Sequence, residues 1–477
     1  MELDLITIVA AGVAALALII MLTSRRGKDA PPMAGLGIPL IGTFIEFAKS
    51  PVGFIMEAYK KFGSVYTVRM MGQNLTFLIG PDVSAPFFKS ADSVLSQPEV
   101  YGFMKAVFGA DVVYDAEPKM RKEQMLHMAQ GLRTDRLKSY VPKIVKETED
   151  FIKGWGEEGE VDLLSVLSDL TILTASRCLH GDDVRENLFG KVSHLYHDLD
   201  QGITPFSFFF PNAPIAAHKT RDNARKEMVK LFGKVIKERR ANPEKTKNNT
   251  DILQVFIDME YKSGKKNTDD QITGLLIALL FAGQHTSSVT STWTALLCCS
   301  RPEIMQRVIN EVDDVVGGET LTFEHVQKLE LMHNCMKEAL RMHPPLIMLM
   351  RKAMKDVPIE SKDGRKWTVP KGDIVITAPS VAMRLPDVFK EPDLFDPDRF
   401  AAPREEHKTP YAYLGFGGGM HQCMGQQFGY LQVKTILATI LSKYEIEMLG
   451  PLPEPDYTAM VVGPKGKPMC RYKRRKN

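Results

Sequence analysis

The sequence contains few cysteines, and their arrangement indicates no structural role. There are six in 477 residues, with no CxxC pair and no regular spacing: Cys178, Cys298, Cys299, Cys335, Cys423 and Cys470. A disulfide framework and a cysteine zinc site are therefore not expected. Five of the six fit ordinary packed or surface positions. Cys423 is the exception, because of the residues around it.

The chain also lacks a Gly/Ser linker, an internal repeat and any break in composition after residue 45. With 44% hydrophobic and 25% charged residues it has the composition of a globular protein with a large core. The net charge of +3 gives no reason to expect a nucleic-acid partner, and the basic stretch at 471–476 is typical of a solvated tail. We therefore expect one large domain over residues 46–477.

A long uncharged and almost wholly apolar run occurs at the N-terminus. Leu5 to Leu22 are 18 residues without a charge, which as a helix span about 27 Å, enough to cross a bilayer core. The alternative is a cleaved signal peptide, but such segments are shorter and follow positive residues. Here acidic residues precede the run and basic residues follow it, so the positive-inside rule places the rest of the chain in the cytosol. We predict a transmembrane signal anchor at 1–24 and a basic, Pro/Gly-rich, non-helical connector at 25–45.

Beyond the connector, the sequence predicts a mainly α protein with small peripheral β-sheets. Helical periodicity is typical of five segments: Lys143–Lys153, Asp162–Cys178, Asp222–Arg239, Asp269–Ser300 and Gln426–Lys443. Four segments have the pattern of short strands, the first two forming a hairpin: Val65–Met70, Leu75–Ile79, Trp367–Val369 and Ile374–Thr377.

The densest motif is Phe416-Gly-Gly-Gly-Met-His-Gln-Cys-Met-Gly425, which leads directly into the last of these helices. Its glycines would let a loop lie close against a flat macrocycle. A cysteine just before a helix N-terminus is stabilised as a thiolate by backbone N–H groups and the helix dipole, and an iron ligand needs that form. Phe416 would shield the sulfur, and Gly425 would let the helix approach the ring. A phosphate-binding glycine loop is the alternative, but its Gly-Lys-Ser/Thr ending is missing.

The spacing Phe-x-x-Gly-x-x-x-Cys-x-Gly resembles that of the haem-thiolate monooxygenases, the cytochromes P-450. The resemblance implies the cytochrome P-450 fold and haem b as the cofactor, with Cys423 as the iron ligand and Phe416 and Gly417 beside the haem. Two further motifs are similar to that family, Glu338-Ala-Leu-Arg341 and the segment Phe395–Phe400. The resemblance implies that Glu338, Arg341 and Arg399 form a structural network that holds the cysteine loop. A surface ion pair is the alternative for the first two.

A third motif, Ala282-Gly-Gln-His-Thr286, lies in the middle of the predicted helix 269–300. Serine and threonine hydroxyls compete for helical carbonyls, so we expect a local widening or kink there. Oxygen activation needs protons, so Thr286 and His285 are the candidate catalytic residues, although a lone histidine is more often a hydrogen-bonded core residue. A histidine before this threonine departs from most of the family and resembles the sterol 14α-demethylases.

Other segments are also similar to those of the sterol 14α-demethylases, and the resemblance implies both a sterol cavity and haem propionate ligands. The implied propionate ligands are Tyr101, Tyr114, Lys122, Arg351 and His421. The implied substrate contacts are Phe103, Met104, Phe108, Ala278, Phe281, Ala282, Leu346, Met348, Met350, Met460 and Val461. For the methionine-rich stripe alone, plain core packing is the alternative. Phe103 falls at the position that is expected to sort sterols by their C4 methyl groups.

The implied reaction is removal of a sterol 14α-methyl group in three oxygenations, with release of formate. The chain has no flavin or nicotinamide motif, so the electrons are expected from a separate NADPH-dependent flavoprotein reductase. The anchor and the resemblance together predict a single-pass protein of the endoplasmic reticulum membrane. A fatty-acid or xenobiotic hydroxylase of the same fold is one alternative, and a haem sensor or electron carrier without oxygen chemistry is another.

Overall fold

The computed structural model describes residues 26–35, 43–204, 207 and 210–476, and its chain divides into two compact units. The strand-rich unit comprises the chain up to Val100 together with Ile347–Lys390 and Lys408–His421. The helical unit comprises Tyr101–Leu346, Glu391–His407 and the chain from Gln422 onward. The predicted anchor at 1–24 and residues 36–42 of the connector lie outside the described residues.

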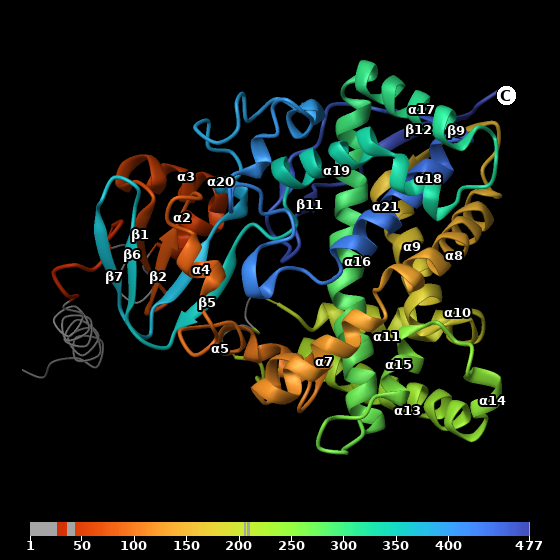
Figure 1. The fold of residues 1–477 in the computed structure, drawn as a ribbon, viewed down its shortest axis with the longest axis horizontal. Helices are drawn as coiled ribbons and strands as arrows, with labels where there is room; N and C mark the ends of the chain where they lie inside the picture. The colour runs from red at the N-terminus through yellow and green to blue at the C-terminus, as the bar shows by residue number, and fades with distance from the viewer. Residues whose placement is uncertain (1–25, 36–42, 205–206, 208–209, 477) are drawn as a thin grey trace, which may run out of the picture. The chain divides into compact units, whose positions relative to one another are not determined.

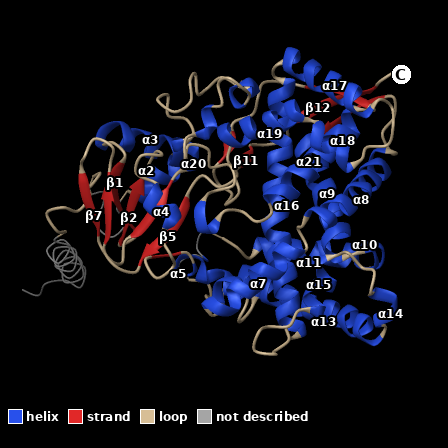
Figure 2. Ribbon diagram, viewed as in Figure 1, coloured by secondary structure: helices blue, strands red, loops and turns tan. Residues whose placement is uncertain are grey.

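The strand-rich unit is built around a five-stranded sheet of order β1-β2-β8-β5-β3, coloured red in Figure 2. Its strands are β1 (Val65–Met70), β2 (Gln73–Leu78), β3 (Leu95–Ser96), β5 (Leu349–Ala353) and β8 (Ile374–Thr377), with a separate pair β6 (Val357–Glu360) and β7 (Lys366–Val369). Its helices are α2 (Phe44–Lys49), α3 (Pro51–Phe62), α4 (Ala85–Lys89), α5 (Pro98–Tyr101, ending at the junction) and α20 (Pro379–Ala382), with the 3₁₀ turn η6 (Gly419–His421).

The hairpin predicted at the start of this unit is confirmed. β1 and β2 pair antiparallel with Val65 opposite Leu78, and the turn between them uses left-handed conformations at Met71 and Gly72, with φ of 49° and 75°. The two later predicted strands are also confirmed, as β7 and β8. β5, which the sequence did not predict, pairs antiparallel with β8 and places Arg351 opposite Val375.

The described part of the connector packs against the five-stranded sheet. Ala34 N donates to Thr67 O over 2.7 Å, and Thr67 N donates to Pro32 O over 2.8 Å, so this segment runs beside β1. Arg26 forms an ion pair with the buried Asp373, which also accepts a 2.8 Å hydrogen bond from Thr76 Oγ1. The expectation of a wholly non-helical connector is wrong at its last two residues, because α2 begins at Phe44.

The helical unit holds most of the helices (Figure 1). Its longer helices are α7 (Pro118–Gln130), α8 (Thr134–Ile152), α9 (Leu163–Ala175), α11 (Phe189–Gln201), α13 (Ala216–Ala241), α16 (Asp269–Cys299), α17 (Pro302–Val316), α19 (Glu330–Met342) and α21 (Gln426–Leu441). The shorter ones are α6 (Lys105–Phe108), α10 (Asp182–Asn187), α14 (Pro243–Thr246), α15 (Ile252–Asp258) and α18 (Phe323–Lys328), with 3₁₀ turns at Gly102–Met104, Val113–Asp115 and Pro397–Phe400. Two small sheets complete it, β4 (Glu158–Asp162), β12 (Met469–Arg474) and β9 (Tyr444–Met448) in that order, and β10 (Pro455–Asp456) with β11 (Gly463–Pro464).

The central helix α16 begins and ends where the sequence predicts. Thr268 and Gln271 form a capping box, in which Gln271 N donates to Thr268 Oγ1 over 3.2 Å and Thr268 N donates to Gln271 Oε1 over 3.0 Å. At 31 residues the helix is about 46 Å long, and it packs against α9, α13, α19 and α21. Among the described residues it alone is long and apolar enough for a membrane span, but most of its apolar stretch is buried, as in a core helix.

The predicted local widening of α16 is wrong. All of its residues are α-helical, because the hydroxyls accommodate themselves by bonding the carbonyl four residues back, as from Thr286 Oγ1 to Ala282 O over 2.7 Å. A π-helical segment occurs instead at Ser176–His180, directly after α9. The other predicted helices are confirmed as α8, α9, α13 and α21, of which α8 and α13 extend further than predicted.

Candidate functional site

A short stretch of α16 is accessible to solvent although the rest of the helix is core. Residues Gln271–Ala278 and Ser287–Cys298 are buried, whereas none of the residues from Phe281 to Thr286 is, and Ala282 is exposed. Ala278, Ala282 and Thr286 are spaced so that they share one face of the helix. The middle of this core helix, which contains the Ala282–Thr286 motif, is therefore accessible to solvent. Such a stretch can accommodate a bound group.

His285 lies in this accessible stretch, where its side chain is half-buried and bonded to a carboxylate rather than enclosed in the core. Its Nε2 is 3.1 Å from Asp200 Oδ1 of α11, and the two side chains are 34% and 32% exposed. Tyr196, one turn earlier on α11, packs its ring 4.6 Å from that of Phe281 and 6.1 Å from that of His285. Burial, aided by the nearby Asp200 charge, raises the pKa of Tyr196 well above its ordinary value, so the tyrosine stays neutral. Asp200 was missed from the sequence, because nothing local to residue 200 indicates that it faces α16.

The segment Tyr101–Tyr114 forms an aromatic cluster against α16. The rings of Tyr101 and Tyr114 stack at 5.3 Å, and Phe103 lies 6.4 Å from Tyr101. Phe108, which is buried, contacts Phe281 of α16 edge to face at 6.2 Å. The structure therefore brings together five of the aromatic residues that the sequence singled out.

Two cations of α7 stand next to each other in the sequence, Arg121 and Lys122. Burial raises the pKa of the Tyr114 hydroxyl, and the positive charge of Arg121 opposes that shift. Lys122 is exposed, because the next residue along α7 is rotated by about 100°. Lys122 therefore stays a predicted propionate ligand, with Arg121 as an alternative on the same helix.

Cys423 stands apart from the other cysteines, all six of which lie in described residues. It alone is exposed, whereas Cys299 is half-buried and the other four are buried. Its sulfur lies just before α21, where burial raises the pKa of the thiol and hydrogen bonds from the backbone N–H groups of Gly425 and Gln426 oppose that rise without cancelling it. N–H groups directed at a sulfur favour its thiolate form, which a metal ligand requires.

The other predicted ligands lie within the strand-rich unit. Arg351 of β5 is buried and stacks over the ring of Phe87, with its guanidinium 4.6 Å from the ring centroid. His421 Nε2 lies 3.2 Å from Asp92 Oδ1. Phe416 and Gly417 are half-buried.

One glycine of the loop has a role that the sequence did not predict. Gly419 has a φ of 64°, and a Cβ there would lie 2.0 Å from Phe88 O. Packing against the backbone at Phe88 therefore accounts for this glycine, without the macrocycle that the sequence argument invoked.

The network around Glu338 is present and completely buried. Arg341 binds the carboxylate with two hydrogen bonds, Nε to Oε2 over 2.7 Å and Nη2 to Oε1 over 2.9 Å. Arg399 Nε donates to Oε1 over 2.9 Å and its Nη1 to Glu406 Oε2 over 2.7 Å. The side chains of Glu338, Arg341 and Arg399 have no exposed surface, so the surface-pair alternative is wrong.

The remaining predicted substrate contacts are distributed over several segments. Leu346 and Met460 are exposed, Met104 and Val461 half-buried and Ala278 buried. A backbone hydrogen bond of 2.9 Å from Val462 N to Pro345 O joins the segments of Leu346 and Met460.

Met350 of β5 and Met348, which directly precedes that strand, are half-buried and pack against the core of the strand-rich unit. Part of their surface therefore serves the plain core role that was the alternative for this stripe.

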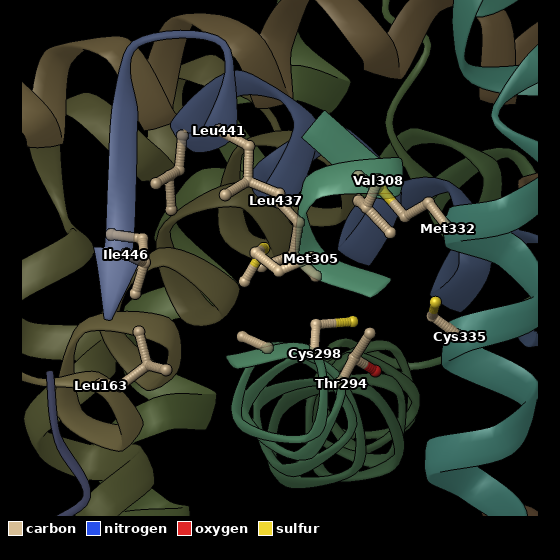
Figure 3. A pocket seen from close by; sticks show the side chains of 12 residues that line it. Leu163, Thr294, Cys298, Met305, Val308, Met332, Cys335, Leu437, Leu441 and Ile446 are labelled. Carbon is tan, nitrogen blue, oxygen red and sulfur yellow. The ribbon is translucent and has the colours of Figure 1, made fainter. Parts of the chain in front are cut away.

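The helical unit also contains a small apolar cavity, and none of the predicted substrate contacts lines it. Its volume is about 20 Å³, which is room for about one water molecule and far too little for a sterol. Figure 3 shows it between Cys298 and Thr294 of α16, Cys335 of α19 and Leu437 of α21. Its lining consists of aliphatic, methionine and cysteine side chains together with Thr294, whose hydroxyl donates to Thr290 O over 2.7 Å, so we interpret the cavity as a packing void.

Comparisons with known proteins identify the family to which the chain belongs. The family model for cytochrome P450 matches residues 31–471. The sterol 14-demethylase of Arabidopsis thaliana is 46% identical over 95% of this chain and 93% of its own, and the obtusifoliol 14-alpha demethylase of Sorghum bicolor is 46% identical over 99% and 96%. The lanosterol 14-alpha demethylase of Cunninghamella elegans is 37% identical over 98% and 97%.

A solved structure, the retinoic acid-bound cyanobacterial CYP120A1, shares the fold with a TM-score of 0.82 at 23% identity, over 94% of this chain and all of that one. The exposed cysteine before α21, with N–H groups directed at its sulfur, fits the thiolate-ligated haem of such proteins. The chain belongs to the cytochrome P450 family, and within it to the sterol 14-demethylases, and its cofactor is thiolate-ligated haem.

Proposed function

We propose that this protein removes the 14α-methyl group of a sterol by three successive oxygenations that end in formate release. The observation that carries the proposal is the accessible stretch of α16, where the His285–Asp200 pair stands beside Thr286. The relatives that carry the names sterol, obtusifoliol and lanosterol 14-demethylase support the same reaction. A fatty-acid or xenobiotic hydroxylase has no comparable support.

Cys423 is the residue that we propose would hold the haem iron, and the haem would supply the oxygen-activating chemistry when bound. Phe416 and Gly417 would flank the ring, and Glu338, Arg341 and Arg399 would hold the segment that leads to the cysteine. A buried guanidinium and a tyrosine hydroxyl are strong partners for carboxylates. The proposed propionate ligands are Tyr101, Tyr114, Lys122, Arg351 and His421, with Arg121 as an alternative to Lys122.

The protein's own contribution to the chemistry is proton delivery at the accessible stretch of α16. Thr286 Oγ1 donates to Ala282 O, so its oxygen can still accept a hydrogen bond from a bound water. His285 is held by Asp200 next to this hydroxyl, where it can exchange a proton with water because both side chains are part-exposed. Asp200, His285 and Thr286 thus form a route from solvent to the reacting oxygen.

Replacing Thr286 and His285 together by alanine is expected to lower the rate of product formation about 100-fold or more, because proton delivery is removed while the sterol contacts remain. NADPH consumption should continue, with peroxide released in place of product. The measurement is the ratio of product to NADPH oxidised, with Asp200→Asn expected to change it in the same direction.

A surface pair on the same helix α11 provides the control. His194 Nε2 lies 3.7 Å from Asp198 Oδ2, and His194 is 75% exposed, so His194→Ala should leave the coupling ratio unchanged. A double variant that keeps full coupling would exclude this route.

The proposed sterol contacts come from α16, the aromatic cluster and the segments at 346–350 and 460–461: Phe103, Met104, Phe108, Ala278, Phe281, Ala282, Leu346, Met348, Met350, Met460 and Val461. All are apolar, as a sterol skeleton requires.

Phe103→Leu is expected to raise kcat/KM for the C4-dimethylated lanosterol relative to obtusifoliol, which has one C4 methyl. The half-buried Phe103 ring takes up space that a second methyl would need, and one methyl in a tight pocket changes specificity by about 10-fold or more. The neighbouring Met104→Leu, of conserved volume, should leave the ratio unchanged. An unchanged ratio in Phe103→Leu as well would show that C4 preference is set elsewhere.

The electrons are proposed to come from a separate NADPH-dependent flavoprotein reductase. We further propose that the protein is held in the endoplasmic reticulum membrane by a single span at residues 1–24, with the rest of the chain in the cytosol. The run of Leu5–Leu22 supports this placement. Partition of the full chain with microsomes after alkaline washing tests it, and release into the supernatant would contradict it.

The test of the proposed function is a binding spectrum of the haem-loaded protein with a panel of ligands. Obtusifoliol and lanosterol should displace the water on the iron and shift the spectrum, whereas lauric acid and cholesterol, which lack the 14α-methyl sterol structure, should not. A shift with lauric acid alone would favour the hydroxylase alternative, and no shift with any ligand would favour a sensor or electron carrier.

A further inference from the structure

The turn that ends α6 is bound by a side chain from a distant part of the sequence. The last carbonyl groups of a helix need donors from outside it. Arg225 of α13 supplies them here, since its Nε donates to Val107 O over 3.1 Å and its Nη2 to Phe108 O over 3.0 Å. The arginine is only 14% exposed.

The same guanidinium is held in place by Asp270 at the start of α16. Arg225 Nη1 donates to Asp270 Oδ1 over 2.8 Å and Nη2 to Oδ2 over 2.9 Å, which makes the salt bridge bidentate. Such a pair fixes orientation as well as distance. Arg225 therefore ties together three elements, the end of α6, α13 and α16.

Two glycines allow the close approach that this arrangement needs. Gly109, with a φ of 99°, follows α6, and a Cβ there would lie 2.0 Å from Arg225 Nη2. On α16, a Cβ at Gly274 would lie 2.0 Å from Phe108 O. The backbone at Phe108 is thus packed closely between Arg225 of α13 and Gly274 of α16.

This fixed backbone carries the Phe108 ring to the accessible stretch of α16. The ring lies edge to face against Phe281, 6.2 Å away, and stacks at the same distance on Tyr114. Phe281 is the residue at which α16 becomes accessible. Whatever holds the turn after α6 therefore also holds one wall of the proposed sterol site.

We propose that Arg225 is a positioning residue for the sterol, which keeps the wall around Phe108 preformed before substrate binds. The inference rests on the proposed function and extends it, since Arg225 itself lies behind the wall and touches no substrate. A preformed wall strengthens binding because no segment has to be ordered when the ligand enters. Loss of the preformed wall should therefore weaken sterol binding and change the selectivity between sterols more than it lowers kcat.

The test is Arg225→Lys in the full-length, haem-loaded protein. Lysine keeps the charge opposite Asp270 but lacks the planar fork that reaches both carbonyls. We expect KM and the spectroscopic Kd for obtusifoliol to rise about 10-fold or more, with kcat changed less than about 3-fold. Amide hydrogen exchange at 107–114 should be faster in the ligand-free variant. Asp270→Asn, which loosens the fork without removing it, should give a smaller change in the same direction.

Arg240 offers a matched control because it joins the same two helices at another point. Its Nη1 donates to Asp269 Oδ1 over 2.8 Å, and it makes no contact with 107–109. Arg240→Gln should leave the sterol KM unchanged.

The inference is overturned if Arg225→Lys loses stability or haem while the surviving holoprotein keeps the wild-type KM, or if Arg240→Gln raises KM equally. A wild-type protein that binds no sterol would overturn the proposed function, and this inference with it. If the wild-type protein binds sterol and the Arg225→Lys variant binds it equally well, this inference alone is overturned.

Discussion

Cys423→Ser should abolish product formation and remove the red-shifted carbon monoxide band of the reduced protein. That band requires a thiolate on the iron, and a serine hydroxyl at this position cannot supply one at neutral pH. The variant should still fold, because Cys423 is exposed and makes no core contact. Circular dichroism and thermal unfolding check the fold, and the reduced carbon monoxide difference spectrum checks the ligand.

Cys299→Ser is the matched control. Cys299 is half-buried at the end of α16 and its Sγ donates to Ile446 O over 3.5 Å, a hydrogen bond that serine can keep. This variant should retain both the band and the activity. Retention of the band in Cys423→Ser would show that another cysteine is the ligand and would refute the assignment of the site.

Glu338→Gln should destabilise the protein strongly and lower the amount of haem it retains. The carboxylate binds two guanidinium groups, those of Arg341 and Arg399, and none of the three side chains is exposed. Removing one partner from a buried network leaves uncompensated charge in the interior, which costs about 3–5 kcal/mol. Denaturant unfolding gives the change in stability, and the ratio of haem absorbance to protein gives the retention.

A surface pair attached to the same segment gives the control for this variant. Arg307 of α17 binds Asp398 through Nη1 and Nη2 at 3.0 and 2.9 Å, one residue before Arg399, but both side chains are about half exposed. Arg307→Gln should therefore cost less than about 1 kcal/mol and leave the haem content unchanged. Equal effects of the two substitutions would mean that the buried network has no special part in holding the segment.

The features that could be predicted from the sequence are those encoded within a few neighbouring residues. The limits of α16 follow from the Thr268–Gln271 capping box, and the β1–β2 hairpin from alternating apolar residues around Gly72. The pairing of Glu338 with Arg341 follows from their spacing of three on one helix. The loop at Cys423 could be recognised because a long, specific spacing lies within ten residues.

The features that were missed depend on contacts between distant segments. Asp200 reaches His285 across 85 residues, and Arg225 reaches Phe108 across 117. Neither partner has a local pattern that indicates the other. The sheet β4-β12-β9 was missed for the same reason, because it joins residues 158–162 to the C-terminal strands.

One further error concerns the backbone geometry of α16. The predicted widening is absent, and hydroxyls along the helix bond to carbonyls within it, as Thr290 Oγ1 does at Thr286 O over 2.6 Å. The hydroxyl-rich sequence therefore predicted this backbone geometry wrongly, whereas the catalytic role of the stretch stays a prediction.

Product analysis of the reconstituted reaction tests directly whether the protein removes the 14α-methyl group of a sterol. The full-length protein is combined with an NADPH-dependent flavoprotein reductase, NADPH, oxygen and obtusifoliol, and the sterol products and formate are quantified by mass spectrometry. The account predicts the 14-demethylated sterol with a new double bond in the ring, one formate per sterol, and the 14α-alcohol and aldehyde as intermediates. Hydroxylation at other carbons without formate, or no conversion of any 14α-methyl sterol by the haem-loaded protein, would contradict it.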